Sequence, residues 1–282
     1  MEIQKRIAAI HDVSGFGKCS LTVALPVLSA AGFEVSVIPT AVLSTHTAVK
    51  PGFTCHDLTD DMLPFVKHWK SIDLSFDAIY SGYLGSTEQI DIVCDVVDMF
   101  KTDKTLIVVD PAMADNGKMY ALFDEQFARE MQKLCKKADI IVPNMTEAAF
   151  LLGREYKEGP YKKEYIVEIL KDLSELGPKK IVLTGVWFEE KHLGAACYDT
   201  KTDKMDIVLK KRFLGMFHGT GDVFASALTA ALVKGKDLKK ATQLAVKFTT
   251  DALKRTAKGY TDHQFGVDFE RSLPMLIRTL RK

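Results

Sequence analysis

The sequence predicts an α/β protein, a three-layer α/β/α sandwich with a central, mostly parallel sheet, and three observations lead to this prediction. Apolar runs rich in β-branched residues recur along the chain and alternate with segments of helical periodicity. Some runs are unbroken, as in Leu106–Val109, which is typical of parallel strands buried on both faces. Polar residues follow these runs directly, and open α/β sheets bind their ligands beyond the carboxyl ends of the strands.

The first half of the chain supplies four strands and the helices between them. The predicted strands are Ile7–Ile10, Val35–Ile38, Ala78–Tyr80 and Leu106–Val109. The predicted helices are Ser20–Ala31, closed by Gly32, then Asp61 to about Lys70, and Glu88–Phe100. The polar segments His11–Lys18 and Ser44–Thr47 are predicted to be loops.

The second half repeats the pattern and then changes character. Ile140–Val142 and Ile181–Leu183 are strands, and Gly194–Tyr198 with Met205–Leu209 form a hairpin around a polar turn. Helices are predicted over Val223–Leu232, from Leu238 to about Lys254, and over Phe269–Leu280. We find no repeat and no linker between Glu2 and Gly259, so we expect a single domain over residues 1–282.

Composition excludes several classes of function. The formal net charge of +1 gives no electrostatic case for nucleic acid or an anionic membrane. The five cysteines contain no C-x-x-C pair, which favours reduced thiols over disulfides or zinc. No apolar run is long enough to span a bilayer, and Met1–Arg6 lacks a signal-peptide pattern, so we expect a cytoplasmic protein.

One loop organises the functional reading: Gly219-Thr220-Gly221-Asp222, directly before an apolar helix. Its glycines permit unusual backbone conformations, and the first helical turn offers unpaired N–H groups and positive dipole charge. This arrangement can hold a phosphate, with Asp222 placed to take a proton from an attacking hydroxyl. The alternative is an ordinary loop capped by Asp222.

Other nucleotide-binding and hydrolytic motifs are missing. Gly17-Lys18-Cys19-Ser20 is not a P-loop, because Cys19 follows the lysine and Asp12 stands where the first glycine belongs. Asp12 could instead form a surface salt bridge with Lys18. No G-x-S-x-G elbow and no histidine pair with metal-ligand spacing occurs.

Asp110 and Glu147 are candidate ligands of Mg²⁺, since each follows a predicted strand that ends at the same edge. The alternative for Asp110 is a turn with Pro111, and for Glu147 a place in the first turn of a helix after Asn144. His46 and Thr47, with Ser81 and Tyr83, could line a pocket for a ring, or could serve only their loops.

Together these stretches resemble the pyridoxal kinase family of the ribokinase-like superfamily over nearly the whole chain. The residues that carry the resemblance are Ser44-Thr45-His46-Thr47, Ser81-Gly82-Tyr83-Leu84-Gly85-Ser86, Asp110-Pro111, Pro143-Asn144 with Glu147, Thr184, and Gly219-Thr220-Gly221-Asp222. The resemblance implies phosphorylation of the 5′-hydroxyl of pyridoxal, pyridoxine or pyridoxamine by ATP. It also implies Mg²⁺, often with a monovalent cation (K⁺ or Na⁺), and a cytoplasmic homodimer.

The same resemblance implies residue roles. Asp222 would be the catalytic base, and the amides of Gly219, Thr220 and Gly221 would form the anion hole. The ATP and Mg²⁺ side would comprise Asp110, Asp115, Asn144, Glu147 and Thr184, with Asp110 and Glu147 serving the metal. The substrate side would comprise Asp12, Cys19, His46, Thr47 and Tyr83.

Two departures from the family pattern concern substrate choice. Asp12 stands where family members commonly have a serine that touches the substrate, and Leu43 stands where an aromatic residue is expected. We expect Asp12, if it faces the ring, to favour a cationic substituent such as the amine of pyridoxamine.

Two rival readings remain open. Hydroxymethylpyrimidine kinases form a sister group that typically has cysteine in the place of Asp222. A non-catalytic protein that binds a vitamer on the same fold is the other, since a fold alone does not give an activity.

Overall fold

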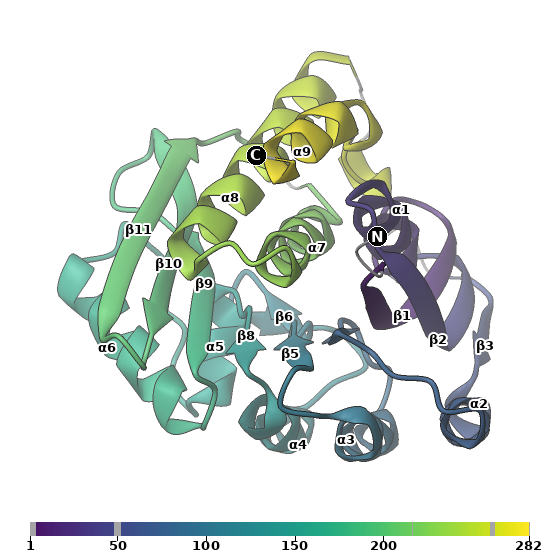
Figure 1. The fold of residues 1–282 in the computed structure, drawn as a ribbon. Coiled ribbons are helices and arrows are strands. Elements are labelled where there is room, and N and C mark those ends of the chain that lie inside the picture. Colours follow the sequence, from purple (N-terminus) through teal and green to yellow (C-terminus); the bar gives the residue numbers. More distant parts are fainter. Residues whose placement is uncertain (1–3, 48–51, 216, 260–262, 282) are drawn as a thin grey trace.

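A nine-stranded sheet runs through the part of the chain that the computed structural model describes, residues 4–47, 52–215, 217–259 and 263–281. Its order is β11-β10-β9-β8-β5-β4-β1-β2-β3 (Figure 1). Its strands are β1 (Arg6–Phe16), β2 (Glu34–Thr45), β3 (Cys55–Asp57), β4 (Ala78–Ser81), β5 (Leu106–Val109), β8 (Ile140–Ile141), β9 (Lys180–Val186), β10 (His192–Asp199) and β11 (Lys204–Lys211). The run from β2 to β9 is parallel, whereas β3, β10 and β11 pair antiparallel.

Helices cover both faces of this sheet, which confirms the predicted three-layer α/β/α architecture (Figure 1). One face carries α1 (Leu21–Ala30), α7 (Thr220–Val233), α8 (Leu238–Gly259) and α9 (Leu273–Leu280). The other carries α2 (Thr59–Ser71), α3 (Thr87–Phe100), α4 (Glu125–Lys137), α5 (Met145–Leu151) and α6 (Lys163–Glu175). A small hairpin of β6 (Ala114–Asp115) and β7 (Lys118–Met119) follows β5.

Strand β5 shows why its run is unbroken. Ile107 and Val109 pack in the core beneath α2 to α6, while Val108 packs in the core beneath α1, α7 and α8. All three side chains are buried. A strand that buries both faces needs apolar residues at every position, as the sequence predicted.

The prediction that His11–Lys18 forms a loop is wrong for its first six residues. Strand β1 continues to Phe16, because Ser14 pairs with Leu43 and Phe16 with Thr45 of β2. The predicted loop at Ser44 is wrong for the same reason, since β2 continues to Thr45. The partner strand, distant in sequence, satisfies these backbone groups despite their polar side chains.

Two helix boundaries also differ. The closing helix α9 starts at Leu273, and a separate 3₁₀ turn covers Glu270–Ser272. Helix α8 continues to Gly259, beyond the predicted end near Lys254. A short 3₁₀ turn, His263–Phe265, lies between them in the chain. These differences leave the carboxyl edge of the sheet unchanged.

Candidate active site

The loop that begins α7 has the backbone that an anion site requires. Gly219 is the N-cap of α7 with φ of 73°, and a Cβ there would overlap the carbonyl oxygen of Lys18. Only glycine fits this position without strain. The Thr220 hydroxyl donates to the carbonyl of Phe217 at 3.1 Å, which turns it away from a ligand role in this conformation. The amides of the first turn therefore remain the groups that face an anion.

Gly221 differs from Gly219 in a way that points to function. A Cβ built at Gly221 meets no atom within 4 Å, and the residue is exposed. The fold itself does not require glycine there. The open space above the first turn of α7 is what a phosphate group needs to approach the amides closely.

Asp222 lies in the first turn of α7, partly exposed, and its environment tunes it towards base catalysis. The pKa of Asp222 is raised from 3.8 to about 7, chiefly by burial and to a smaller extent by the negative charge of Asp12. Hydrogen bonding to the backbone of Ser20 opposes the increase. A carboxyl group with a pKa near neutrality can accept a proton and release it again under physiological conditions.

Asp110 stands directly after β5 and is buried. Burial raises the pKa of Asp110 well above its ordinary value, and the charge of Asp222 adds to the increase. The charge of Asp222 therefore reaches Asp110 across the edge of the sheet. That the strand ends and the α7 loop form one site stays a prediction.

Glu147 lies in the first turn of α5, which is the alternative that the sequence left open for it. Asn144 caps α5 by accepting from the amides of Thr146 (2.8 Å) and Glu147 (2.9 Å). Glu147 completes a capping box through the Asn144 amide at 2.8 Å, and it accepts from the Met113 amide at 3.2 Å. The pair holds the hairpin to the sheet, because the Asn144 side chain also donates to the carbonyl of Ala114 at 2.8 Å.

Glu147 also lies near Asp110. Burial raises the pKa of Glu147 well above its ordinary value, and the charge of Asp110 is the next cause. Two buried carboxyl groups that repel one another fit a divalent cation, which would relieve both the burial and the repulsion. In the described ranges no three His, Cys, Asp or Glu side chains form a group that could hold a metal ion. A pair of carboxyl groups such as Asp110 and Glu147 suits Mg²⁺, which binds through one or two carboxylates together with water and substrate phosphates.

Asp12 lies on β1 where its register with β2 shifts, and only 5% of the residue is exposed. Its carboxylate accepts from the Ser14 hydroxyl at 3.1 Å. The alternative that Asp12 forms a surface salt bridge with Lys18 is wrong: Lys18 forms an ion pair with Glu270 at 2.8 Å. The sequence did not single out Ser14, although an acid two residues before a serine is a common local pairing.

Several predicted substrate residues surround Asp12. Its charge raises the pKa values of Cys19 and Tyr83, for which burial is the larger cause. His46 is buried; its Nε2 lies 2.7 Å from the carbonyl of Gln264, and its ring lies 5.1 Å from that of His218. Thr47 is exposed at the end of a described range, and no contact of its side chain ties it to these residues.

The structure also places Asp115 and Thr184, two of the residues predicted for the nucleotide side. Asp115 lies on β6, exposed, and accepts from the amide of Asn116 at 2.9 Å. Thr184 lies within β9, and its amide donates to the carbonyl of Pro143 at 2.9 Å. Sequence reasoning missed Tyr120, which follows β7 and is 38% exposed; its pKa is raised by desolvation and then by the charge of Glu147. The hairpin before Tyr120 is too short to leave a periodic signal.

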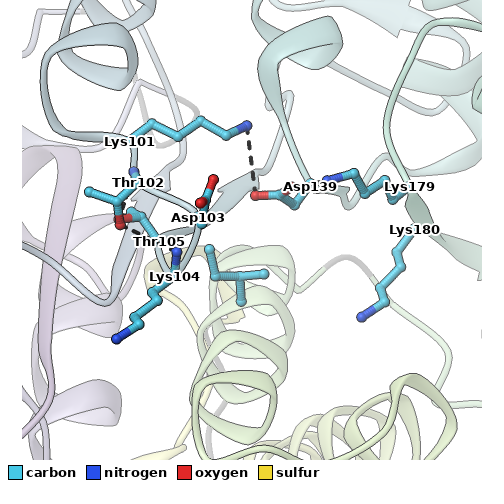
Figure 2. Close-up of a pocket in the computed structure, with 9 residues that line it drawn as sticks. Lys101, Thr102, Asp103, Lys104, Thr105, Asp139, Lys179 and Lys180 are labelled. Atoms are coloured by element: carbon cyan, nitrogen blue, oxygen red, sulfur yellow. Dashed lines mark hydrogen bonds and ion pairs between the residues drawn. The ribbon is translucent and has the colours of Figure 1, made fainter.

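The hollow drawn in Figure 2 lies at the opposite edge of the sheet, before β5, β8 and β9. Its volume is about 490 Å³, and its lining includes Lys101, Lys104, Lys179, Lys180 and Asp139. Asp139 pairs with Lys179 at 3.2 Å and accepts from the amide of Ile107 at 3.0 Å. None of the predicted site residues lines it, so it is separate from the candidate active site.

Comparison with known proteins places the chain in a family. The family model described as phosphomethylpyrimidine kinase matches residues 29–266. A hydroxymethylpyrimidine/phosphomethylpyrimidine kinase of Bacillus subtilis is 28% identical over 227 residues, 79% of each chain. In the described ranges, no helix has the length and apolar character needed to cross a bilayer.

Solved structures give the same result. A provisionally named phosphomethylpyrimidine kinase from Bacteroides thetaiotaomicron, crystallised with pyridoxal, is 40% identical with a TM-score of 0.92, over 97% of this chain and 96% of that one. Pyridoxal kinase from Lactobacillus plantarum is 30% identical with a TM-score of 0.89, over 98% of each chain. The chain therefore belongs to the phosphomethylpyrimidine kinase family of the ribokinase-like superfamily, which includes pyridoxal kinase-like and hydroxymethylpyrimidine kinase-like enzymes.

Proposed function

We propose that the chain phosphorylates the 5′-hydroxyl of a vitamin B6 vitamer with ATP, as a pyridoxal kinase acting in pyridoxal phosphate salvage. The observation that carries the proposal is Asp222, with a pKa near neutrality, in the first turn of a helix whose N-cap glycine exposes its amides. The likeness to a Bacteroides protein crystallised with pyridoxal supports a pyridine substrate.

The proposed mechanism assigns one task to each side of the site. Asp222 orients the substrate hydroxyl and takes its proton, while the α7 amides stabilise charge on the transferred phosphoryl group. Because the transition state for phosphoryl transfer is loose, positioning and electrostatics contribute more than the strength of the base. Asp12, Cys19, His46, Thr47 and Tyr83 form the substrate side.

Asp110 and Glu147 would hold Mg²⁺, directly or through water, and the bound ion would neutralise charge on the ATP phosphates. Asp115, Asn144 and Thr184 line the nucleotide side, where a monovalent cation (K⁺ or Na⁺) would also act. A cytoplasmic homodimer belongs to the same proposal, as does a single catalytic domain over residues 1–282.

Hydroxymethylpyrimidine kinase activity is the second candidate function. The family model and the relative from Bacillus subtilis favour it. Asp222 favours the vitamer instead, since that sister group typically carries cysteine at this position. A protein that binds a vitamer without turnover is the third possibility on this fold.

The test is ADP release from ATP and Mg²⁺ with pyridoxal, pyridoxine, pyridoxamine and hydroxymethylpyrimidine in parallel. We expect turnover with a vitamer and a loss of about 10²- to 10⁴-fold in kcat for Asp222→Ala, the range for removing a general base. Turnover with the pyrimidine alone would assign the protein to the sister activity. Vitamer binding without ADP release would overturn the catalytic proposal.

A further inference from the structure

Asp12 is a buried acid whose neighbours include serine hydroxyl groups and the ring of His46. It is 5% exposed, and its carboxyl group accepts a hydrogen bond from the hydroxyl of Ser14 at 3.1 Å. In the described ranges no lysine or arginine lies within ion-pair distance of Asp12. Lys18, the lysine nearest to it in the sequence, pairs with Glu270 instead. Burying a carboxylate without a cation costs stability, so such a group is retained where a ligand supplies the missing partner.

The neighbouring histidine on the same strand does not supply a positive charge that would balance Asp12. His11 is fully buried, and burial lowers its pKa to about 3, so its ring is neutral at physiological pH. His46 lies near enough to oppose the increase that burial causes in the pKa of Asp12. Its Nε2, however, is engaged with the carbonyl of Gln264 at 2.7 Å.

Asp12 lies at the centre of residues that come from separate parts of the chain. A Cβ built at Gly219 of α7 would meet Lys18 and Cys19, and one built at Gly17 would meet the ring of His46, so the segments before α1, after β2 and at the start of α7 pack together beyond the strand that carries Asp12. The charge of Asp12 also raises the pKa values of Cys19, of Tyr83 after β4, and of Asp222. Convergence of four segments on one acid is what a binding site produces and what a local turn does not.

The positions of Asp12 and Asp222 determine which two substituents of a bound ring face the two acids. The charge of Asp12 raises the pKa of Asp222, and the charges of both acids raise the pKa of Cys19, after burial as the larger cause. If Asp222 faces the hydroxymethyl group of the substrate, Asp12 faces a substituent close to it. In pyridoxamine and in the aminopyrimidine of thiamine synthesis, the ring carbon next to the hydroxymethyl carbon carries a group with an amine nitrogen. Pyridoxine has a second alcohol at that position.

We propose that Asp12 is a specificity-determining residue: its carboxylate binds an amine beside the reacting hydroxymethyl group and selects amine-bearing substrates over their alcohol counterpart. The proposal rests on the proposed function of the same site. The aminomethyl group of pyridoxamine, when protonated, forms a charge-assisted hydrogen bond with Asp12, and the aminopyrimidine donates N–H groups to it. A site built to accept a hydrogen bond from a substrate donor discriminates strongly against an analogue that lacks this donor.

The test compares kcat/KM for pyridoxamine, pyridoxine and the aminopyrimidine in the wild type, Asp12→Asn and Asp12→Ser. We expect the wild type to prefer pyridoxamine to pyridoxine by about ten-fold or more, and both variants to reduce that ratio to within about three-fold. Asp12→Asn keeps the shape of the side chain and removes its charge. Asp206→Asn is the control, because this acid pairs with Lys239 on the distant hairpin.

The possible results distinguish pyridoxamine from the aminopyrimidine as the substrate, and they distinguish a failure of the role of Asp12 from a failure of the kinase proposal. Preference for the aminopyrimidine over pyridoxamine, lost in Asp12→Asn, would keep the role of Asp12 and move the substrate to the pyrimidine. An unchanged ratio in both variants, with turnover intact, would overturn the role of Asp12 and leave the kinase proposal standing. If no substrate is turned over, calorimetric affinities of pyridoxamine and pyridoxine for the same proteins decide the question by the same ratio.

Discussion

At the scale of the residue, environment decides what each acid does. Asp222, Asp110 and Glu147 are all carboxyl groups with raised pKa values, and burial is the first cause in each. Their hydrogen bonds differ. Glu147 is held by two backbone amides and organises a helix start, whereas Asp222 stands in an open first turn. The carboxyl group of Glu147 therefore has a structural role in addition to its proposed place beside Mg²⁺, whereas that of Asp222 fits a catalytic role.

The variant Asp222→Asn tests the raised pKa of Asp222 through the pH dependence of the free energy of unfolding. Since the folded pKa is about 7 against an ordinary 3.8, the folded state binds more protons than the unfolded chain between these values. Ionisation of Asp222 thus lowers stability as pH rises through this window, and the penalty persists above it. The neutral amide escapes the penalty.

Denaturant unfolding of both proteins at about pH 5 and about pH 8.5 measures the effect. We expect the variant to gain about 2 kcal/mol relative to the wild type at the higher pH, a value reduced for the partial exposure of Asp222. Parallel stability profiles for the two proteins would show that the carboxyl group has an ordinary pKa in the folded chain.

At the scale of the element, the start of α7 depends on two glycines with different tasks. Gly219 adopts positive φ and packs on the carbonyl of Lys18, so it joins α7 to the segment before α1. Gly221 has open space around it. The first glycine serves the fold, and the second leaves room for a ligand.

Gly219→Ala and Gly221→Ala separate these tasks. We expect Gly219→Ala to lose about 2–4 kcal/mol of stability, from the strained backbone and the overlap with Lys18. Gly221→Ala keeps stability within about 1 kcal/mol but loses about ten-fold or more in kcat/KM for ATP, because the methyl group obstructs the amides. Thermal unfolding and steady-state kinetics of both variants measure the two effects. Equal loss of stability in both would refute this division.

At the scale of the whole molecule, the parallel sheet brings distant segments to one edge. The charge of Asp12 on β1 affects Asp222 of α7, and the charge of Asp222 affects Asp110 after β5, although these residues lie far apart in the chain. The concentration of negative charge there has a consequence for binding. Ligands that bring cations to this edge stabilise the folded state by more than their contacts alone suggest.

Ligand-induced stabilisation tests this consequence. We expect saturating ADP with Mg²⁺ to raise the Tm by about 5 °C or more, as binding well above Kd predicts. Removing Mg²⁺ with EDTA, or replacing Asp110 by Asn, reduces the increase, since the carboxylate pair and the nucleotide share the ion. An increase that persists unchanged in EDTA would exclude a metal from nucleotide binding.

The sequence by itself determined the layers of the fold and the loop at the start of α7. Buried strands such as Leu106–Val109 and the glycines around Thr220 leave local signals, because burial and backbone conformation restrict which residues are tolerated. Asn144 followed three residues later by Glu147 also carries the signature of a capping box, although the sequence-based interpretation assigns Asn144 to the ATP side and Glu147 to the metal or to the first turn of a helix.

The tertiary structure alone decided the extension of β1 to Phe16, the isolation of Asp12 from Lys18, and the neighbours of Tyr120. Each depends on partners far away in the chain: β2 pairs with the end of β1, Glu270 takes Lys18, and Glu147 affects Tyr120. A local pattern reports the propensities of its own residues. It carries no record of which distant backbone or charge completes a site, because that contact exists only once the sheet has formed.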